Sequence, residues 1–143
     1  MVKSIGNKKL NTAVFISGTG TNLRSIILYS LKKNSKIKVS LIVSDNLKAI
    51  GLKYAKKYKI NKLVLNYKNK KNSESKILRI LQKNKIKFIC LAGYMRILSS
   101  FFLKNFKYSI INIHPSLLPK YKGLNTHERV LNNNEKYTGC TVH

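Results

Sequence analysis

The amino-acid sequence predicts an α/β fold built on a doubly wound, mostly parallel sheet. Short apolar runs alternate along the chain with segments whose apolar residues recur at helical spacing. The run at 87–92 is typical of a central parallel strand, because such a strand is buried on both faces. The 143 residues suffice for one domain with its own core, and no internal repeat or low-complexity linker divides them.

Each element is predicted from its apolar pattern, in chain order. A strand at 13–17 ends in a glycine-rich loop, and a helix with an apolar stripe follows from 23 to 31. The same alternation then gives strand 38–44, helix 47–58, strand 62–65, helix 74–84, strand 87–92, a short helix 99–105 and strand 109–113. A Pro- and Gly-rich loop precedes a helix at 126–132 and a strand that begins within 138–143.

Three loops of this predicted sheet carry the residues of chemical interest. They are the segments 18–22, 93–98 and 112–115, and each follows or ends a strand. Because ligands of doubly wound sheets bind beyond the carboxyl ends of the strands, we expect all three at one edge of the molecule.

The loop at 18–22 (Gly-Thr-Gly-Thr-Asn) stands between the first strand and the first helix. Glycines let a backbone approach a ligand closely, and a helix N-terminus offers free N–H groups to an anion. The loop is no dinucleotide fingerprint, since Leu23 replaces the third glycine of G-x-G-x-x-G, and it lacks the Gly-Lys-Ser/Thr ending of a P-loop. Taken alone, it is equally compatible with a phosphate site and with a plain tight turn.

The strand at 109–113 ends in an asparagine and a histidine two residues apart, Asn112 and His114. Side chains at i and i+2 of a strand point to the same face, so this pair can project into one pocket. An amide N–H stabilises a developing oxyanion, and an imidazole moves a proton near neutral pH. The pair predicts chemistry on a carbonyl group and favours phosphate binding at the glycine loop on the same edge.

The formal net charge of +25 raises the question of nucleic-acid binding. The charge comes from 25 lysines and only 4 arginines, spread along the chain and accompanied by many Asn and Ile residues. Those residue types share A/T-rich codons. Arginine, whose guanidinium makes paired hydrogen bonds to bases and phosphates, is scarce. We therefore interpret the charge as compositional bias and expect no specific nucleic-acid partner, although anionic substrates should be attracted.

Other function classes are excluded by what the sequence lacks. Cys90 and Cys140 form neither a disulfide scaffold nor a metal-ligand spacing, so we expect reduced, inert thiols, no metal and a cytoplasmic protein. No apolar run approaches the ~20 residues of a membrane span, and the basic segment 1–11 lacks the apolar core of a signal peptide. We expect no membrane partner.

The segments 16–23 (ISGTGTNL), 91–98 (LAGYMRIL) and 112–119 (NIHPSLLP) occur in this order, followed by 120–127 and 139–143. Together they strongly resemble the phosphoribosylglycinamide formyltransferases, the folate-dependent enzymes of purine biosynthesis, from about residue 13 to residue 143. The Asn-x-His-Pro-Ser block is shared by the wider formyltransferase superfamily. The glycine loop and the Leu-Pro-Lys-Tyr-x-Gly run point to the purine branch rather than to its tRNA or hydrolase relatives. The resemblance implies the Rossmann-like fold of a formyltransferase N-terminal domain.

The resemblance also implies an activity: transfer of a formyl group from the co-substrate 10-formyltetrahydrofolate to the amine of 5-phosphoribosylglycinamide. It implies that Asn112 binds the oxyanion and contacts folate, and that His114 is the catalytic acid. The remaining implied site residues bind the substrate phosphate, namely Gly20, Thr21 and Asn22, or line the folate pocket, namely Met95, Arg96, Ile97 and Leu98.

Some parts that the resemblance implies do not match this sequence. An essential aspartate would lie on a loop just after the strand that begins at Gly139, and a last strand, a final helix and a substrate-contacting glutamate would follow it. The only aspartate, Asp45, is no substitute by position, and Lys70 or Lys71 stands where a folate-contacting arginine is implied. We therefore expect residues 1–143 to form a single, C-terminally truncated catalytic domain that is a poor catalyst by itself.

Three alternatives remain at this point. The chain is an inactive or split remnant that binds phosphate or folate without turnover, a basic nucleic-acid-binding module, or an enzyme that formylates a different amine such as that of a sugar nucleotide. His127 is predicted to belong to a helix start after Thr126, and His143 to lie near the site. The sequence leaves the oligomeric state open.

Overall fold

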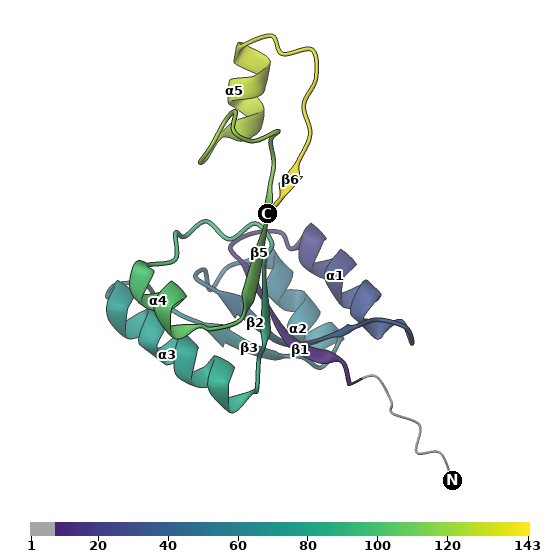
Figure 1. The fold of residues 1–143 in the computed structure, drawn as a ribbon, viewed down its shortest axis with the longest axis vertical. Helices are drawn as coiled ribbons and strands as arrows, with labels where there is room; N and C mark the ends of the chain where they lie inside the picture. The colour runs from purple at the N-terminus through teal and green to yellow at the C-terminus, as the bar shows by residue number, and fades with distance from the viewer. Residues whose placement is uncertain (1–7) are drawn as a thin grey trace.

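A computed structural model describes residues 8–143 and contains one six-stranded sheet (Figure 1). The strand order is β3-β2-β1-β4-β5-β6; β1 to β5 are parallel, and β6 pairs antiparallel with β5. The strands are β1 (Leu10–Ile16), β2 (Ile37–Ser44), β3 (Asn61–Val64), β4 (Phe88–Leu91), β5 (Ser109–His114) and β6 (Thr141–Val142). The predicted α/β fold with a mostly parallel sheet is confirmed.

The helices connect these strands in the alternation that the sequence predicts. They are α1 (Thr21–Leu31), the 3-10 turn η1 (Ile50–Leu52), α2 (Lys53–Lys57), α3 (Lys70–Lys83), α4 (Ser100–Asn105) and α5 (Thr126–Asn132). None of the helices among residues 8–143 is long and apolar enough to cross a membrane. Most of the basic N-terminal segment, residues 1–7, lies outside the described residues.

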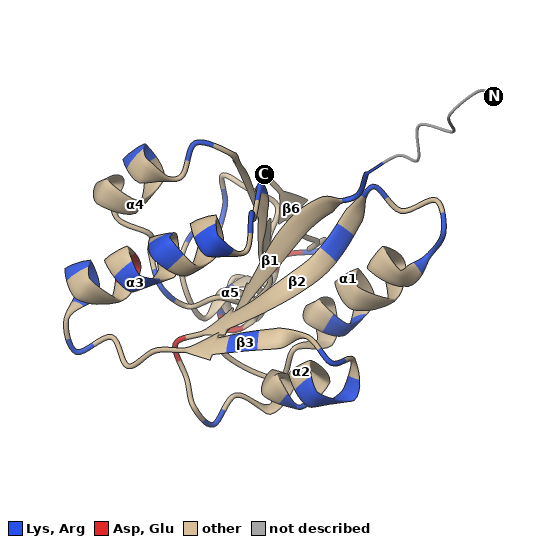
Figure 2. Cartoon of the chain, turned by 90° about the horizontal axis from the view of Figure 1, so that it is seen from below, with Lys and Arg blue, Asp and Glu red and all other residues tan. Residues whose placement is uncertain are grey.

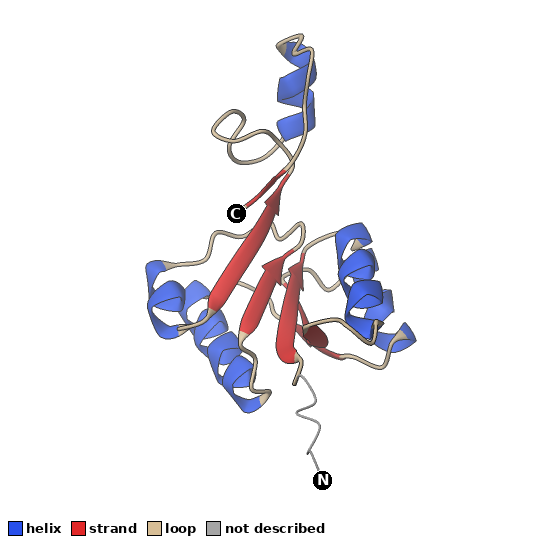
Figure 3. Cartoon of the chain, turned by 45° about the vertical axis from the view of Figure 1, so that its right-hand side comes forward, coloured by secondary structure: helices blue, strands red, loops and turns tan. Residues whose placement is uncertain are grey.

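Helices cover both faces of the sheet, as a doubly wound fold requires (Figure 3). Successive residues of β1 show why: Ala13 and Phe15 pack with α3 and α4, whereas Val14 and Ile16 pack with α1 on the opposite face. All four are fully buried. The strand is therefore apolar from Ala13 to Ile16, because neither face of this part meets solvent.

The largest departures from the predicted helix ranges are at two helices, and local polar contacts explain both. Helix α3 begins at Lys70, four residues before the predicted start, because the Asn69 side chain caps it by accepting from the Asn72 N–H at 3.0 Å. The predicted helix at 47–58 is split into η1 and α2. There the Asn46 side chain accepts from the Lys48 N–H at 2.9 Å and folds the chain into a turn first.

The segment after β5 stands away from the two helical layers (Figure 1). It comprises a loop with a cis Leu118–Pro119 bond, helix α5 and the return to β6. Its own hydrogen bonds stabilise it: the buried Ser116 hydroxyl donates to the Lys120 carbonyl at 2.7 Å, and Thr141 Oγ1 donates to the Ser116 carbonyl at 2.7 Å. These contacts fix the loop that follows the Asn112–His114 pair.

Lys and Arg occur on α1, α2, α3 and α4 and on the loops between elements, so they are spread over the fold rather than gathered on one element (Figure 2). Only four acidic residues stand among them in the sequence. The spread agrees with the interpretation of the charge as a property of composition.

Candidate functional site

The three loops singled out from the sequence follow the carboxyl ends of β1, β4 and β5. Because the chain runs outward from β1 to β2 and β3 on one side and to β4 and β5 on the other, the topology switches between β1 and β4. Ligands of doubly wound sheets bind at such a switch point. The order of the strands therefore places the candidate residues at one edge, as expected.

The glycine loop makes a tight connection between β1 and α1. Gly20 is the N-cap of α1 and has a φ of +75°, a left-handed conformation that favours glycine. A Cβ at Gly20 would come within 2.7 Å of the Gly51 Cα, so the loop and η1 approach each other too closely for a side chain. No side chain caps this helix, and its first turn contains no acidic residue. Thr21 and Asn22 are exposed at this end of α1.

The segment at 93–98 runs alongside the end of β1. The Gly93 carbonyl accepts from the Ser17 N–H at 3.1 Å, and the Met95 N–H donates to Ser17 Oγ at 2.8 Å. Met95 and Ile97 are 60% and 85% exposed, so they form an open apolar surface rather than part of the core.

Tyr94, in contrast, is partly buried and packs its side chain against the core. Its ring packs edge-on against Phe15 with centroids 5.2 Å apart. Its hydroxyl shares a hydrogen bond with the hydroxyl of Tyr67, from the loop after β3. Burial raises the pKa of both phenols, so both stay neutral and the hydrogen bond persists across the physiological range.

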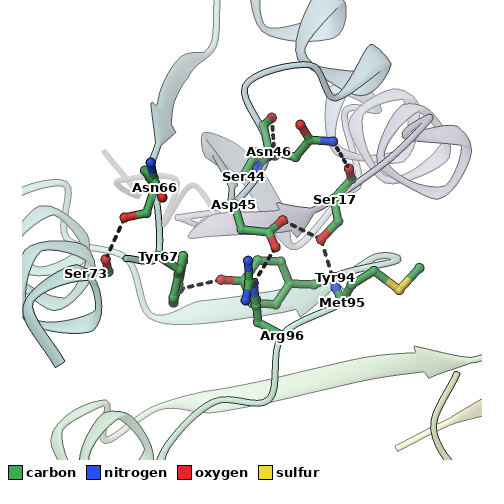
Figure 4. Close-up of polar contacts among 10 residues, drawn as sticks. All are labelled: Ser17, Ser44, Asp45, Asn46, Asn66, Tyr67, Ser73, Tyr94, Met95 and Arg96. Carbon is green, nitrogen blue, oxygen red and sulfur yellow. Dashed lines mark hydrogen bonds and ion pairs between the residues drawn. The ribbon is translucent and has the colours of Figure 1, made fainter. Parts of the chain in front are cut away.

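Arg96 is held by a carboxylate that sequence reasoning set aside. Its Nε donates to Asp45 Oδ2 at 2.8 Å, and the other oxygen, Oδ1, accepts from the Ser17 hydroxyl at 2.6 Å (Figure 4). The Arg96 guanidinium also lies over the Tyr67 ring, 5.3 Å from its centroid. The side chain of Asp45 is 7% exposed and that of Arg96 is 51% exposed. Loops that follow four different strands are thereby joined.

Asn112 lies at the carboxyl end of β5, where β6 pairs with it. Its backbone exchanges two hydrogen bonds with His143, of 2.7 and 3.0 Å, and its side-chain Nδ2 lies 3.0 Å from His143 Nε2. Because the amide nitrogen only donates, His143 Nε2 accepts and this imidazole carries its proton on Nδ1. His143 therefore orients the Asn112 carboxamide.

His114 follows Asn112 on the same face of β5 and is half-buried. Its Nε2 lies 2.9 Å from the Tyr121 carbonyl oxygen. A carbonyl only accepts, so Nε2 carries a proton and Nδ1 is the nitrogen that remains for proton transfer. The Tyr121 carbonyl thus fixes both the ring and its tautomer.

The remaining histidine and the two cysteines differ in their exposure. His127 is exposed on α5, and Cys140 is exposed shortly before β6. Burial raises the pKa of the Cys90 thiol to about 11, so it stays protonated and unreactive, as expected. Within residues 8–143, no group of three or more His, Cys, Asp or Glu residues is arranged to hold a metal ion.

Comparison with known proteins shows the family of the chain. The family model described as "Formyl transferase" matches residues 10–143. The chain belongs to the formyl transferase family. It is 41% identical to the phosphoribosylglycinamide formyltransferase of Haemophilus influenzae over 134 residues, which cover 92% of this chain and 63% of that protein. It is also 41% identical to the human trifunctional purine biosynthetic protein adenosine-3, over 98% of this chain and 14% of that protein.

Solved structures share the fold. The phosphoribosylglycinamide formyltransferase of Brucella melitensis superposes with a TM-score of 0.88 at 39% identity, covering 95% of this chain and 72% of that one. The enzyme of that name from Anaplasma phagocytophilum superposes with a TM-score of 0.87 at 37% identity, covering 95% and 64%. The chain thus spans less than two thirds of the length of the curated relatives described above.

Sequence reasoning found the three loops but undervalued two of their partners. The sequence sets Asp45 aside because it does not stand at the position of the implied essential aspartate, yet it follows β2 and contacts Ser17 and Arg96. His143 was weighed only as a neighbour of the site, yet it pairs with Asn112. The one available signal for Asp45 was its rarity: it is the only aspartate in the chain and directly follows a buried strand.

Proposed function

We propose that this chain carries the site for formyl transfer from 10-formyltetrahydrofolate to the amine of 5-phosphoribosylglycinamide, in purine biosynthesis. The observation that carries the proposal is the Asn112–His114 pair, which shares one face of β5 and is oriented by separate hydrogen bonds to His143 and Tyr121. An oriented amide beside an oriented imidazole suits acyl transfer, in which charge builds on a carbonyl oxygen.

The glycine loop supplies the proposed phosphate subsite. Gly20, Thr21 and Asn22 begin α1, whose first N–H groups have no partner within the helix. The helix dipole and these donors favour an anion, and no acidic residue of the first turn opposes it. We assign the phosphate of the acceptor to this end of α1.

The folate subsite is assigned to Met95, Arg96, Ile97 and Leu98, with Asn112 at its inner end. The exposed Met95 and Ile97 side chains offer apolar surface to an aromatic ring system. Arg96 offers a fixed cation for a carboxylate of the co-substrate.

In the proposed reaction the acceptor amine attacks the formyl carbon, and negative charge develops on the formyl oxygen. An Asn112 Nδ2–H not used by His143 and a protonated His114 Nδ1–H would stabilise that charge. His114 would then deliver its proton to the folate nitrogen as the bond between that nitrogen and the formyl carbon breaks, and the proton that the acceptor amine loses would return to His114 Nδ1. The role of Tyr121 would be to hold the ring during both steps.

The proposed partners are therefore two small anionic molecules, bound by a domain within residues 1–143 with no requirement for a metal. A net charge of +25 attracts such substrates, so their apparent affinity should fall as ionic strength rises. A cytoplasmic location stays a prediction.

A formyl-transfer assay with both substrates tests the proposal. In a chain extended by the C-terminal segment with the implied aspartate, we expect turnover and a loss on the order of 10² or more in kcat for His114→Ala, because proton transfer by a positioned imidazole contributes that much. His127→Ala is the matched control, since His127 is an exposed histidine on α5, and it should leave kcat within about threefold of the original. Equal loss in both variants would remove His114 from the mechanism. Binding of both ligands with no turnover would support the alternative of a non-catalytic binding protein.

A further inference from the structure

Asp45 joins loops that follow three different strands at the switch point of the sheet (Figure 4). It directly follows β2, and it contacts Ser17 after β1 and Arg96 after β4. Its side chain is 7% exposed, so its charge is largely removed from water. A buried carboxylate needs partners, and Asp45 has one for each of its oxygens.

The contacts of Asp45 close a ring of hydrogen bonds. The Met95 N–H donates to Ser17 Oγ at 2.8 Å, the Ser17 hydroxyl donates to Asp45 Oδ1 at 2.6 Å, and Arg96 Nε donates to Asp45 Oδ2 at 2.8 Å. Met95 and Arg96 are adjacent in sequence, so one carboxylate fixes both the backbone and a side chain of the same loop. Removing the carboxylate would release both.

The ring orients Arg96 but leaves part of its guanidinium group without a hydrogen bond, among residues 8–143. Among residues 8–143, its hydrogen bonds engage only Nε, and the Tyr67 ring covers one face of the guanidinium. Half of the side chain is exposed, so the two terminal NH₂ groups remain for a ligand. A free arginine loses rotamer entropy when it is immobilised, and an arginine already held by an aspartate loses less on binding.

We propose that Asp45 is a positioning residue for the formyl donor: it holds Arg96 and the 95–98 loop in the orientation that receives an anionic group of that molecule. The inference rests on the proposed function for the identity of the ligand, but the geometry of the ring is independent of it. Asp45 acts through Arg96 and does not itself touch the reacting atoms.

The Asp45→Asn variant tests the proposal, because the amide keeps the shape of the side chain but removes its charge. The new NH₂ group also faces one of the two hydrogen-bond donors, the Ser17 hydroxyl or Arg96 Nε. We expect the KM for the formyl donor to rise about tenfold, the size of a lost charge-assisted hydrogen bond. The kcat and the KM for the acceptor should stay within about threefold, since the other subsite is untouched. Glu128→Gln, which removes an exposed carboxylate on α5, is the control for net charge.

A double-mutant cycle separates positioning from a general structural role. If Asp45 acts through Arg96, Asp45→Asn should have no further effect on the donor KM in an Arg96→Gln background. A rise of the same size in both backgrounds, or an equal loss in kcat and in both KM values, would overturn the proposal.

Amide hydrogen exchange keeps the test independent of turnover. The Met95 N–H should exchange at least about tenfold faster in Asp45→Asn than in the unaltered chain, because its acceptor Ser17 loses its anchor. If the chain neither binds folic acid in calorimetry nor transfers a formyl group, the proposed function fails while this readout still decides whether the ring is held by Asp45. Unchanged Met95 exchange would refute the inference.

Discussion

The contact between Gly20 and Gly51 gives the sharpest test of how the glycine loop at 18–22 is built. In Gly20→Ala, the residue would keep a φ near +75°, and its new Cβ would lie 2.7 Å from the Gly51 Cα. The left-handed conformation costs a non-glycine residue about 1–2 kcal/mol, and relief of an overpacked contact costs a further 1–3 kcal/mol or so. We therefore expect the free energy of unfolding to fall by about 2–5 kcal/mol.

Urea unfolding measures this change. Far-ultraviolet circular dichroism is the probe, because the chain has no tryptophan whose fluorescence could report unfolding. Gly18→Ala is the matched control: Gly18 has no positive φ, and nothing lies within 4 Å of the position that its Cβ would take. That variant should unfold within about 1 kcal/mol of the unaltered chain, because a compatible Gly→Ala change mainly restricts the unfolded state. If Gly20→Ala proved as stable as Gly18→Ala, the close approach of the loop to η1 would be wrong.

Two further predictions concern the segment after β5 and the two thiols. Glu135 accepts from Lys120 Nζ and from the Tyr121 hydroxyl, which lower its pKa, so its stabilising effect is present above the unfolded pKa of about 4.3 and is lost as pH falls through the lower folded pKa. The stability difference between the unaltered chain and Glu135→Gln should therefore shrink between pH 7 and pH 3, and a constant difference would contradict this. Cys140 is exposed whereas Cys90 is buried with a raised pKa, so iodoacetamide at pH 8 should add one group, at Cys140, by mass spectrometry. Rapid double alkylation of the folded chain would be inconsistent with the buried position of Cys90.

The alternation of strands and helices was predictable because it depends on the spacing of apolar residues within short segments. Apolar strands such as 88–91 and helical stripes such as that of α3 depend on periods of two and 3.6 residues. The observed helix boundaries differ from the predicted ones where polar contacts, and not the apolar pattern, set them. The start of α3 depends on the Asn69 cap, and the split between η1 and α2 follows the turn at Asn46, both polar contacts that an apolar pattern does not contain.

The candidate site was predictable in its loops but not in its connections. Parallel strands bring their carboxyl ends to one edge, so the glycine loop, the 93–98 loop and the Asn112–His114 pair could be placed together without coordinates. The residues that orient them could not. The Tyr121 carbonyl reaches His114 only because the loop between them turns back, and no side-chain motif marks a backbone acceptor.

The sequence by itself determined the class of fold and the edge at which the candidate site residues gather, since each of these follows from short segments. Only the tertiary structure decided which partners hold those residues. Asp45 is 28 residues from Ser17 and 51 from Arg96, and Asn112 is 31 from His143. Contacts over such separations depend on strand order and register, and these arise when the whole sheet buries its apolar faces.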